Sequence, residues 1–298
     1  MQMSSSMVLN LAKAAGSMTK GEILPAAGDY YSYIDLYVNN EYTGTVHNGQ
    51  SATPFSSISE ALAWIWDDKR NLSYNIRVVK TDTLYTGAYI RDITVPVSIS
   101  GIVDGGLKPK VDFLYVSGCP NVTIQNLDFN GAGTSTTSAI VMLFVQLSNV
   151  YLSACDFEET NMTAGTRNAI RCFMGQVYLT GCTFTGNDTS TLNSIVAYRT
   201  GKIISAASNT FTKVQRCYDT NVMELYLRGA DTISNVTTYL QSNTAQAWPV
   251  VISPSAAIAA NMAYNNQYAR SMPFYLNASH PNCMVVGTSI VEIDTTSI

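Results

Sequence analysis

The feature that most constrains the fold of this chain is an internal repeat. Three segments of eight residues align without gaps, beginning at Val122, Val150 and Val177 and each ending in phenylalanine. A weaker copy covers residues 202–211, and the four phenylalanines are 28, 27 and 27 residues apart. Self-similarity with a period in the twenties indicates a solenoid, in which each repeat packs mainly against its neighbours.

A second element follows the same period, at residues 140–144, 170–174, 195–199 and 222–226. Each repeat therefore contains two or three short strands of alternating pattern, joined by turns rich in Gly, Asn, Ser and Thr. Short strands without helices at this period favour an all-β parallel β-helix, a single-chain solenoid with about 25–28 residues per coil. Its coils would be stacked about 4.8 Å apart.

Alternation within residues 122–129 assigns side chains to the interior or the surface. We expect an inward group of Val122, Ile124, Leu127 and Phe129 and an outward group of Thr123, Gln125 and Asp128. The phenylalanines would form an internal column, in which each buried ring contributes up to about 3 kcal/mol. Cys155 and Cys182 share another inward column. They could form a disulfide, but side chains of parallel neighbours point alongside each other, so we favour two small core residues.

The chain divides into four regions. Residues 1–33 do not fit the coil pattern and are expected to be a leader that attaches the protein to a larger body. Residues 34–75 contain a strand and a short N-terminal capping helix, which has a capping box at Ser57 and Glu60 and a buried stripe at Ile58, Ala61, Leu62 and Ile65. Such a helix would cover open strand edges. Residues 76–250 form the coils, and 251–298 add terminal coils or a C-terminal cap.

Several of these segments carry a resemblance to a known family. Residues 53–62 (TPFSSISEAL), 76–79 (IRVV), 97–102 (VSISGI) and 121–129 (NVTIQNLDF) resemble the start of a pectin-lyase-like right-handed parallel β-helix. Pectin methylesterases and phage tailspikes share this start, and the resemblance covers roughly residues 35–250. The chain lacks the Gly-Arg-Pro-Trp, Gly-His-Gly and Arg-x-Pro-x-x-Arg segments that enzymes of this fold carry. The resemblance therefore implies the fold and leaves the activity open.

Composition excludes several classes of function. Lys, Arg, Asp and Glu make up only 13% of the chain, against roughly 25% in an ordinary domain. The sequence has no basic stripe, so nucleic-acid binding is not expected. It has no apolar run long enough to span a membrane, and its N-terminus is a poor secretory signal. The six cysteines form no CxxC pair, and the two histidines lie outside the repeat. We expect no metal and no cofactor.

Three acidic residues are weak catalytic candidates. Asp128 and Asp156 occupy one outward column on adjacent coils, about one strand spacing apart, which is compatible with the roughly 5 Å between the carboxylates of a retaining glycosidase. Like charges would also raise one pKa, as a general acid requires. The alternative is that each aspartate caps its turn. Glu158 is either a loop charge, a third member of the site or a calcium ligand.

Carbohydrate binding is predicted for Tyr151, Tyr178, Arg171 and Asp156. The two tyrosines share an outward column, and Arg171 follows on another strand of the intervening coil. Aromatic faces pack against sugar rings while Asp and Arg bind hydroxyls. The same tyrosines could instead be buried against another subunit, and we place this interpretation slightly ahead.

These observations favour a bacteriophage virion protein: a tailspike, tail fibre or head-decoration protein that forms a homotrimer. It would contact other virion proteins through its leader and attach to a host-surface polysaccharide. It would be made in the host cytoplasm and released by lysis. Two alternatives stay open, a polysaccharide depolymerase on the same fold and a purely structural virion protein without glycan binding.

Overall fold

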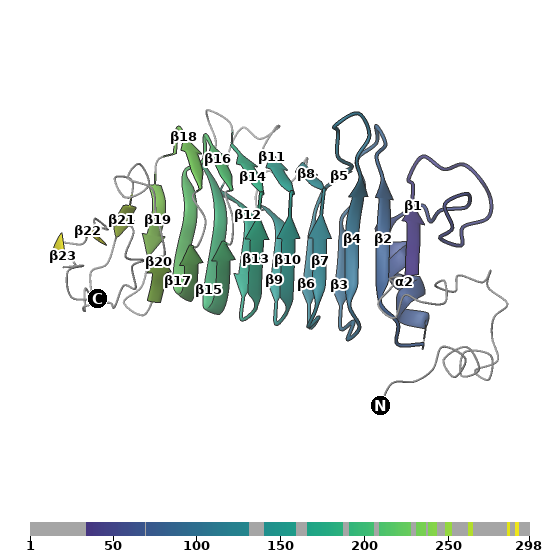
Figure 1. Ribbon diagram of the computed structural model, residues 1–298, viewed down its shortest axis with the longest axis horizontal. Coiled ribbons are helices and arrows are strands. Elements are labelled where there is room, and N and C mark those ends of the chain that lie inside the picture. Colours follow the sequence, from purple (N-terminus) through teal and green to yellow (C-terminus); the bar gives the residue numbers. More distant parts are fainter. Residues whose placement is uncertain are drawn as a thin grey trace, which may run out of the picture.

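Parallel strands stack along one axis in the computed structural model, with the N-terminal strands at one end and the later coils at the other (Figure 1). The structure describes residues 34–68, 70–130, 140–158, 166–186, 191–205, 209–227, 231–236, 238–242, 248–251, 262–264, 285–286 and 290–291. The predicted leader and most of residues 251–298 lie outside this description. The predicted parallel β-helix is confirmed.

Each complete coil, from residue 97 to residue 242, contributes one strand to each of three faces, and the described residues before residue 97 contribute strands to faces 1 and 3 only. Face 1 consists of β1 (Ile34–Val38), β2 (Tyr74–Val79), β4 (Val97–Ile102), β7 (Val122–Gln125), β10 (Asn149–Ser153), β13 (Gln176–Thr180) and β20 (Trp248–Val251). Face 2 consists of β5 (Lys110–Val111), β8 (Asp128–Asn130), β11 (Asp156–Glu158), β14 (Thr183–Thr185), β16 (Thr210–Thr212) and β18 (Thr232–Ser234). Face 3 consists of β3 (Ala88–Arg91), β6 (Leu114–Ser117), β9 (Ile140–Gln146), β12 (Thr166–Phe173), β19 (Thr238–Ser242) and β21 (Met262–Tyr264).

Two long strands join faces 3 and 1. The first halves of β15 (Thr191–Ser205) and β17 (Arg216–Leu227) pair on face 3 and their second halves pair on face 1. Faces 1 and 3 are therefore hydrogen-bonded into one 15-stranded sheet, whereas face 2 is a separate sheet. A short antiparallel pair, β22 (Val285–Val286) and β23 (Ile290–Val291), follows near the C-terminus.

The repeat predicted the register of faces 1 and 2, but on face 3 it predicted only the pairing of residues 170–174 with 195–199 correctly. Val122, Val150 and Val177 are in register, as predicted. On face 3, however, Ile170 pairs with Leu143, so the alignment of residues 140–144 with 170–174 was wrong by three residues. Residues 222–226 pair mainly on face 1. The alignment error arose because apolar residues occur throughout β9, so an alignment shifted by three residues still placed an apolar side chain in the interior.

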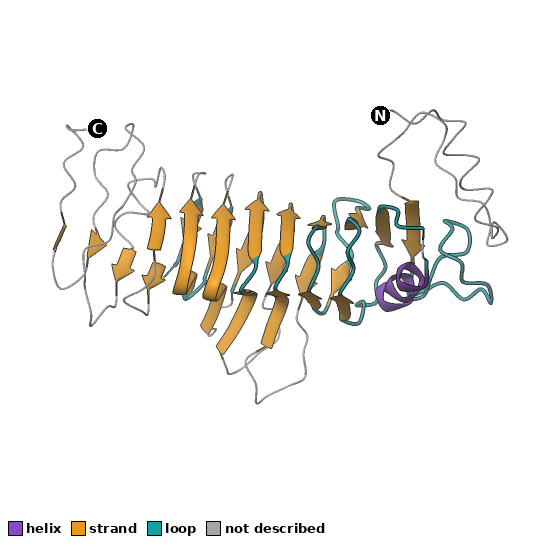
Figure 2. Ribbon diagram, turned by 90° about the horizontal axis from the view of Figure 1, so that it is seen from below, coloured by secondary structure: helices purple, strands orange, loops and turns teal. Residues whose placement is uncertain are grey.

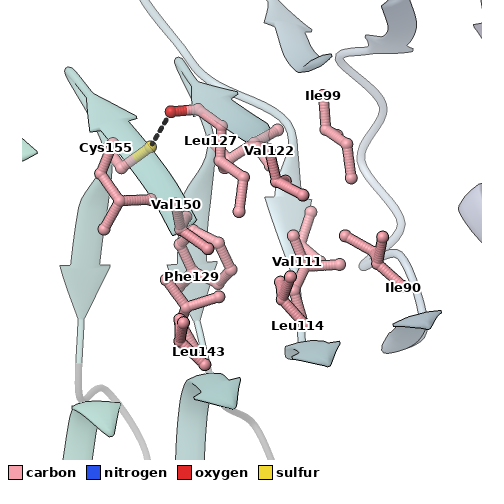
Figure 3. Close-up of a cluster of buried hydrophobic side chains, with 14 of the residues drawn as sticks. Ile90, Ile99, Val111, Leu114, Val122, Leu127, Phe129, Leu143, Val150 and Cys155 are labelled. Carbon is pink, nitrogen blue, oxygen red and sulfur yellow. Dashed lines mark hydrogen bonds between the residues drawn. The ribbon is translucent and has the colours of Figure 1, made fainter. Parts of the chain in front are cut away.

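The predicted phenylalanine column fills the interior behind face 2. Phe129, Phe157, Phe184 and Phe211 are fully buried. Their ring centroids are 4.7, 5.0 and 4.8 Å apart, and neighbouring planes differ by only 4–6°. Apolar residues gather around Phe129, including Val111 and Leu114 of the preceding coil and Leu143 of the same coil (Figure 3). Near-parallel ring planes indicate that face 2 twists little from coil to coil.

The cysteines in this interior are buried thiols. Cys155 and Cys182 are both free, which confirms that they are core residues and not a disulfide. Burial raises the pKa of each thiol. The same holds for the other three cysteines in the described part of the chain, Cys119, Cys172 and Cys217.

The turn from face 1 to face 2 is made by one left-handed residue per coil. Asn126, Ala154 and Gly181 occupy equivalent positions, with φ of 55°, 50° and 61°. Leu147 adopts φ of 50° at the turn from face 3 to face 1. Only glycine and, to a lesser degree, asparagine adopt this conformation at little cost, so Ala154 and Leu147 store strain.

The capping helix α2 (Ile58–Asp67) packs beside β1, β2 and β3 at the N-terminal end, as Figure 2 shows. The Ser57 hydroxyl accepts a hydrogen bond from Glu60 N, and the predicted stripe of Ile58, Ala61, Leu62 and Ile65 is buried. The predicted helix and the Ser57 cap are confirmed, but the capping box is only half formed, because Glu60 Oε2 accepts hydrogen bonds from Ser56 and not from the backbone N of Ser57.

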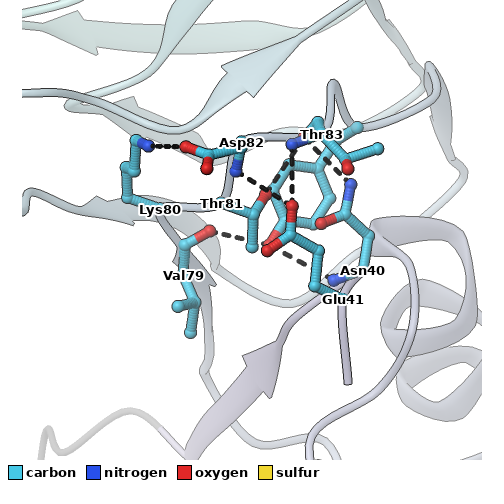
Figure 4. Close-up of polar contacts among 8 residues, drawn as sticks. Asn40, Glu41, Val79, Lys80, Thr81, Asp82 and Thr83 are labelled. Atoms are coloured by element: carbon cyan, nitrogen blue, oxygen red, sulfur yellow. Dashed lines mark hydrogen bonds and ion pairs between the residues drawn. The ribbon is translucent and has the colours of Figure 1, made fainter. Parts of the chain in front are cut away.

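Polar contacts tie the loop that follows β1 to the turn after β2 (Figure 4). Glu41 Oε1 accepts hydrogen bonds from the backbone N of Asp82 and Thr83, at 3.0 and 2.9 Å. Lys80 Nζ lies 2.6 Å from Asp82 Oδ1. These contacts use the carboxylates locally, so this cluster has a structural role.

Candidate binding and catalytic sites on the β-helix surface

The predicted site residues lie on three different faces. Tyr151 and Tyr178 lie on face 1, Asp128, Asp156 and Glu158 on face 2, and Arg171 on face 3. Three separate surfaces therefore have to be considered, because the predicted carbohydrate-binding set is not gathered in one place.

The two tyrosines of face 1 are neighbours, as predicted. Tyr151 pairs with Tyr178, and their ring centroids are 5.7 Å apart with planes tilted by 45°. Tyr151 is 42% exposed. The column continues with the apolar Ile204 on one side and with Thr123 on the other. An exposed pair of rings beside an apolar side chain suits a protein contact better than a glycan.

Face 2 carries a cluster of acidic residues beside two lysines. Asp128 is in register with Lys110 on one side and Asp156 on the other, and Glu158 lies two residues beyond Asp156. Lys108 Nζ forms a 2.6 Å ion pair with Asp156 Oδ2. The predicted juxtaposition of Asp128 with Asp156 is confirmed.

Asp128 differs from its neighbours in its burial. Its side chain points to the outer side of the coil but is only 8% exposed, and its Oδ1 has no hydrogen-bond partner. Burial, followed by the negative charge of Glu158, raises the pKa of Asp128 to about 6, although Lys110 opposes the shift. A carboxyl group that keeps its proton near pH 6 can act as a general acid.

Asp156 already has a cationic partner in Lys108, which also joins the segment before β5 to β11. This ion pair is the competing structural explanation for the acidic cluster, because it neutralises one of the two aspartates. Within the described residues, no three His, Cys, Asp or Glu side chains are placed to hold a metal ion.

Face 3 carries an aromatic surface that the sequence-based prediction missed. We call Tyr89, Phe113, Tyr115 and Phe144 the aromatic ledge. Tyr115 and Phe144 stack with centroids 4.8 Å apart and planes within 8°, so they present mainly their edges to solvent. Tyr89 is tilted by 44° from Tyr115 and is 53% exposed. It ends the column, because β3 pairs only with β6 among the described strands, so its ring is the most accessible of the ledge.

Several contacts fix the ledge in place. The Phe113 ring packs edge-on to Tyr89 at 5.4 Å and occupies the space over Gly87, where an added Cβ would come within 2.0 Å of Phe113 Cε1. The Tyr115 hydroxyl donates a hydrogen bond to Gln146 Oε1. The rings are therefore preorganised, which lowers the entropic cost of binding a ligand.

Arginine side chains border the ledge. The Arg91 guanidinium lies over Tyr89 and Tyr115, 4.6 and 5.2 Å from their ring centroids. Arg171, one of the predicted glycan-binding residues, follows Phe144 in register. Aromatic rings beside guanidinium and amide groups are the combination that carbohydrate sites use.

A sequence signal for the ledge did exist. Tyr89, Tyr115, Phe144 and Arg171 are 26, 29 and 27 residues apart, close to the repeat period. It was missed because the first two rings precede the recognisable repeat and because residues 140–144 were aligned incorrectly.

A cavity of about 290 Å³ opens between the end of α2 and the turn after β3. Trp66, Asp68, Asp92 and Thr94 are among the residues that line it. Asp68 is bound by Arg70 at 2.6 Å, so one of the two carboxylates is already engaged. The cavity is therefore a weaker candidate than the ledge.

No protein-family model, no curated protein and no solved structure matches the chain. A function for this protein therefore has to be argued from the geometry of its surface. In the part of the chain that the structure describes, no helix is long and apolar enough to cross a membrane.

Proposed function

We propose that this protein is a glycan-binding β-helix of a bacteriophage virion, a tailspike, tail fibre or head-decoration protein that attaches the particle to a host-surface polysaccharide. The observation that carries the proposal is the aromatic ledge, with its open Tyr89 ring beside Arg91. The resemblance of residues 53–62 and 121–129 to the tailspike type of β-helix supports the virion setting. So does the low content of charge.

In this proposal the other surfaces serve assembly. Face 1, with Tyr151, Tyr178 and Ile204 along one column, is the contact between subunits of a homotrimer. Residues 1–33 bind another virion protein.

Binding of surface polysaccharide to the full-length protein tests the proposal, with Tyr89→Ala and Tyr151→Ala as a matched pair. Both rings are exposed and both lie on outward positions, so neither variant should unfold the coil.

We expect Tyr89→Ala to weaken binding about fivefold or more, because stacking of one aromatic ring is worth about 1 kcal/mol or more. Tyr151→Ala should leave binding unchanged once native mass spectrometry shows that the variant has the same oligomeric state as the wild-type protein. If only Tyr151→Ala weakens binding and its oligomeric state is unchanged, the glycan site lies on face 1. If no polysaccharide binds while a capsid or tail partner does, the protein is purely structural.

A second candidate function is polysaccharide depolymerisation, which the buried Asp128 favours. Asp128 would give its proton to the glycosidic oxygen as the carbon–oxygen bond breaks, and a carboxylate oxygen of Asp156 or Glu158 would bond to the anomeric carbon. Water activated by Asp128 would then release the sugar and restore the carboxylate.

Release of reducing ends from host polysaccharide tests this candidate. A hydrolase of this kind would lose its turnover in Asp128→Asn and in whichever of Asp156→Asn and Glu158→Gln removes the nucleophile, whereas Thr183→Ala, in the same column as Asp156, would keep it. Absence of turnover in the wild-type protein at pH 5, where Asp128 is still largely protonated, would exclude the candidate.

A further inference from the structure

We infer that the aromatic ledge selects acidic polysaccharides, and that Arg91 is the residue that determines this specificity. The inference rests on the proposed glycan binding and adds the chemical class of the glycan. The shared chemistry is an anionic group on the sugar, either a uronate carboxylate or a sulfate or phosphate ester.

The first argument is the position of Arg91. Its guanidinium lies over two rings at once, Tyr89 and Tyr115. Stacking of this kind restricts a long side chain that would otherwise move freely, so its donors are held in place before a ligand arrives.

The second argument is the charge of Arg91. Salt bridges in the described part of the chain involve Arg70, Lys80 and Lys108, and none involves Arg91. Arg91 is exposed at the end of β3. A guanidinium without a carboxylate partner presents its donor fork to solvent, and that fork matches the two oxygens of a carboxylate or ester group.

The third argument is the combination of the charge with a sugar-binding surface. The Tyr89 ring is the accessible aromatic surface of the ledge, and Arg91 lies directly against it. A sugar packed on this ring would bring a ring substituent near the guanidinium. A neutral polysaccharide would leave the guanidinium without a partner and gain only the stacking contact.

Binding of three commercial polymers to the full-length protein by calorimetry tests this inference: polygalacturonate, dextran sulfate and neutral dextran. We expect one or both acidic polymers to bind at least tenfold more tightly than dextran. Arg91→Gln should remove about ten- to a hundredfold of that affinity, which is the range for a charge-assisted hydrogen bond. Arg91→Lys should restore only part of it, because lysine lacks the fork.

Lys80→Gln is the control, since it removes the same charge from the end of β2, where Lys80 is bound to Asp82. An equal loss in Lys80→Gln would show general charge attraction and overturn the inference. Equal binding of dextran and the acidic polymers would overturn it while leaving glycan binding intact. Binding of none of the polymers, nor of host polysaccharide, would overturn both. Preference for polygalacturonate over dextran sulfate, or the reverse, identifies the carboxylate or the ester as the ligand group.

Discussion

Asp128→Asn should change the pH dependence of stability, because the folded protein holds the Asp128 proton more tightly than the unfolded chain does. Burial raises the pKa of Asp128 from an ordinary 3.8 to about 6. Well below pH 3.8 the carboxyl is protonated in both states. Between about pH 4 and pH 6 the unfolded chain loses this proton first, so stability falls as pH rises, and above pH 6 the whole cost is present.

The size of the effect follows from the two pKa values. Their difference corresponds to about 2–3 kcal/mol of unfolding free energy above pH 6. Asparagine has nearly the same shape and cannot ionise, so Asp128→Asn should remove this cost. The difference in unfolding free energy between the variant and the wild-type protein should therefore favour the variant by about 2–3 kcal/mol more at pH 8 than at pH 4.

Urea unfolding of both proteins at pH 4 and pH 8 measures this difference, and any pH-independent cost of the amide cancels between the two conditions. Asp156→Asn is the contrasting variant. It breaks the 2.6 Å pair with Lys108 and should destabilise the protein at pH 8. An Asp128→Asn effect that is the same at both pH values would refute the reasoning, because burial beside Glu158 would then not perturb the carboxyl.

Three further outcomes follow from the packing. Phe157→Ala should lower the unfolding free energy by about 3–5 kcal/mol, since it removes a ring stacked on both sides; Thr183→Ala should cost under about 0.5 kcal/mol, and similar losses in the two variants would contradict the column. Leu147→Gly should raise the unfolding free energy by about 0.5–1 kcal/mol by relieving its φ of 50°, and a loss would show that the leucine side chain has a packing role. Cys155 and Cys182 should resist thiol reagents at pH 7.5 until urea is added, as mass spectrometry of the labelled peptides can show; fast native labelling would contradict their burial.

The elements that the sequence predicted correctly share one property, a strong local or periodic signal. Phe129, Phe157 and Phe184 repeat with an invariant spacing to their valines, so register on faces 1 and 2 follows from alignment alone. The capping helix was predictable because Ser57 and Glu60 form a local motif. In each case the residues that decide the structure lie within one repeat or one helical turn.

What was missed depends on segments from different coils. The connections between faces 2 and 3 differ in length, since β8 ends at Asn130 and β9 begins at Ile140, whereas β11 ends at Glu158 and β12 begins at Thr166. Period alone therefore could not set the register of face 3, and the aromatic ledge was lost with it. The burial of Asp128 is equally non-local, because its backbone N donates to Pro109 O at 3.0 Å, in the segment that carries Lys108 and Lys110.

The scarcity of charge has a cause that also marks the candidate sites. Two like charges one coil apart repel by about 1–3 kcal/mol at the surface, and a column of identical charges would repeat that cost at every coil. The column that begins Lys110, Asp128 and Asp156 illustrates this, because the next three residues along it are Thr183, Thr210 and Thr232. Where two aspartates do adjoin, a lysine binds one and the other is buried with a raised pKa. Arg91 is the opposite case, a charge kept at the end of its column with its guanidinium over two rings and with no salt bridge to an acid within the described residues. Because the surface carries few charges elsewhere and retains them at the acidic cluster and beside the aromatic ledge, these two surfaces are the first to test by mutagenesis.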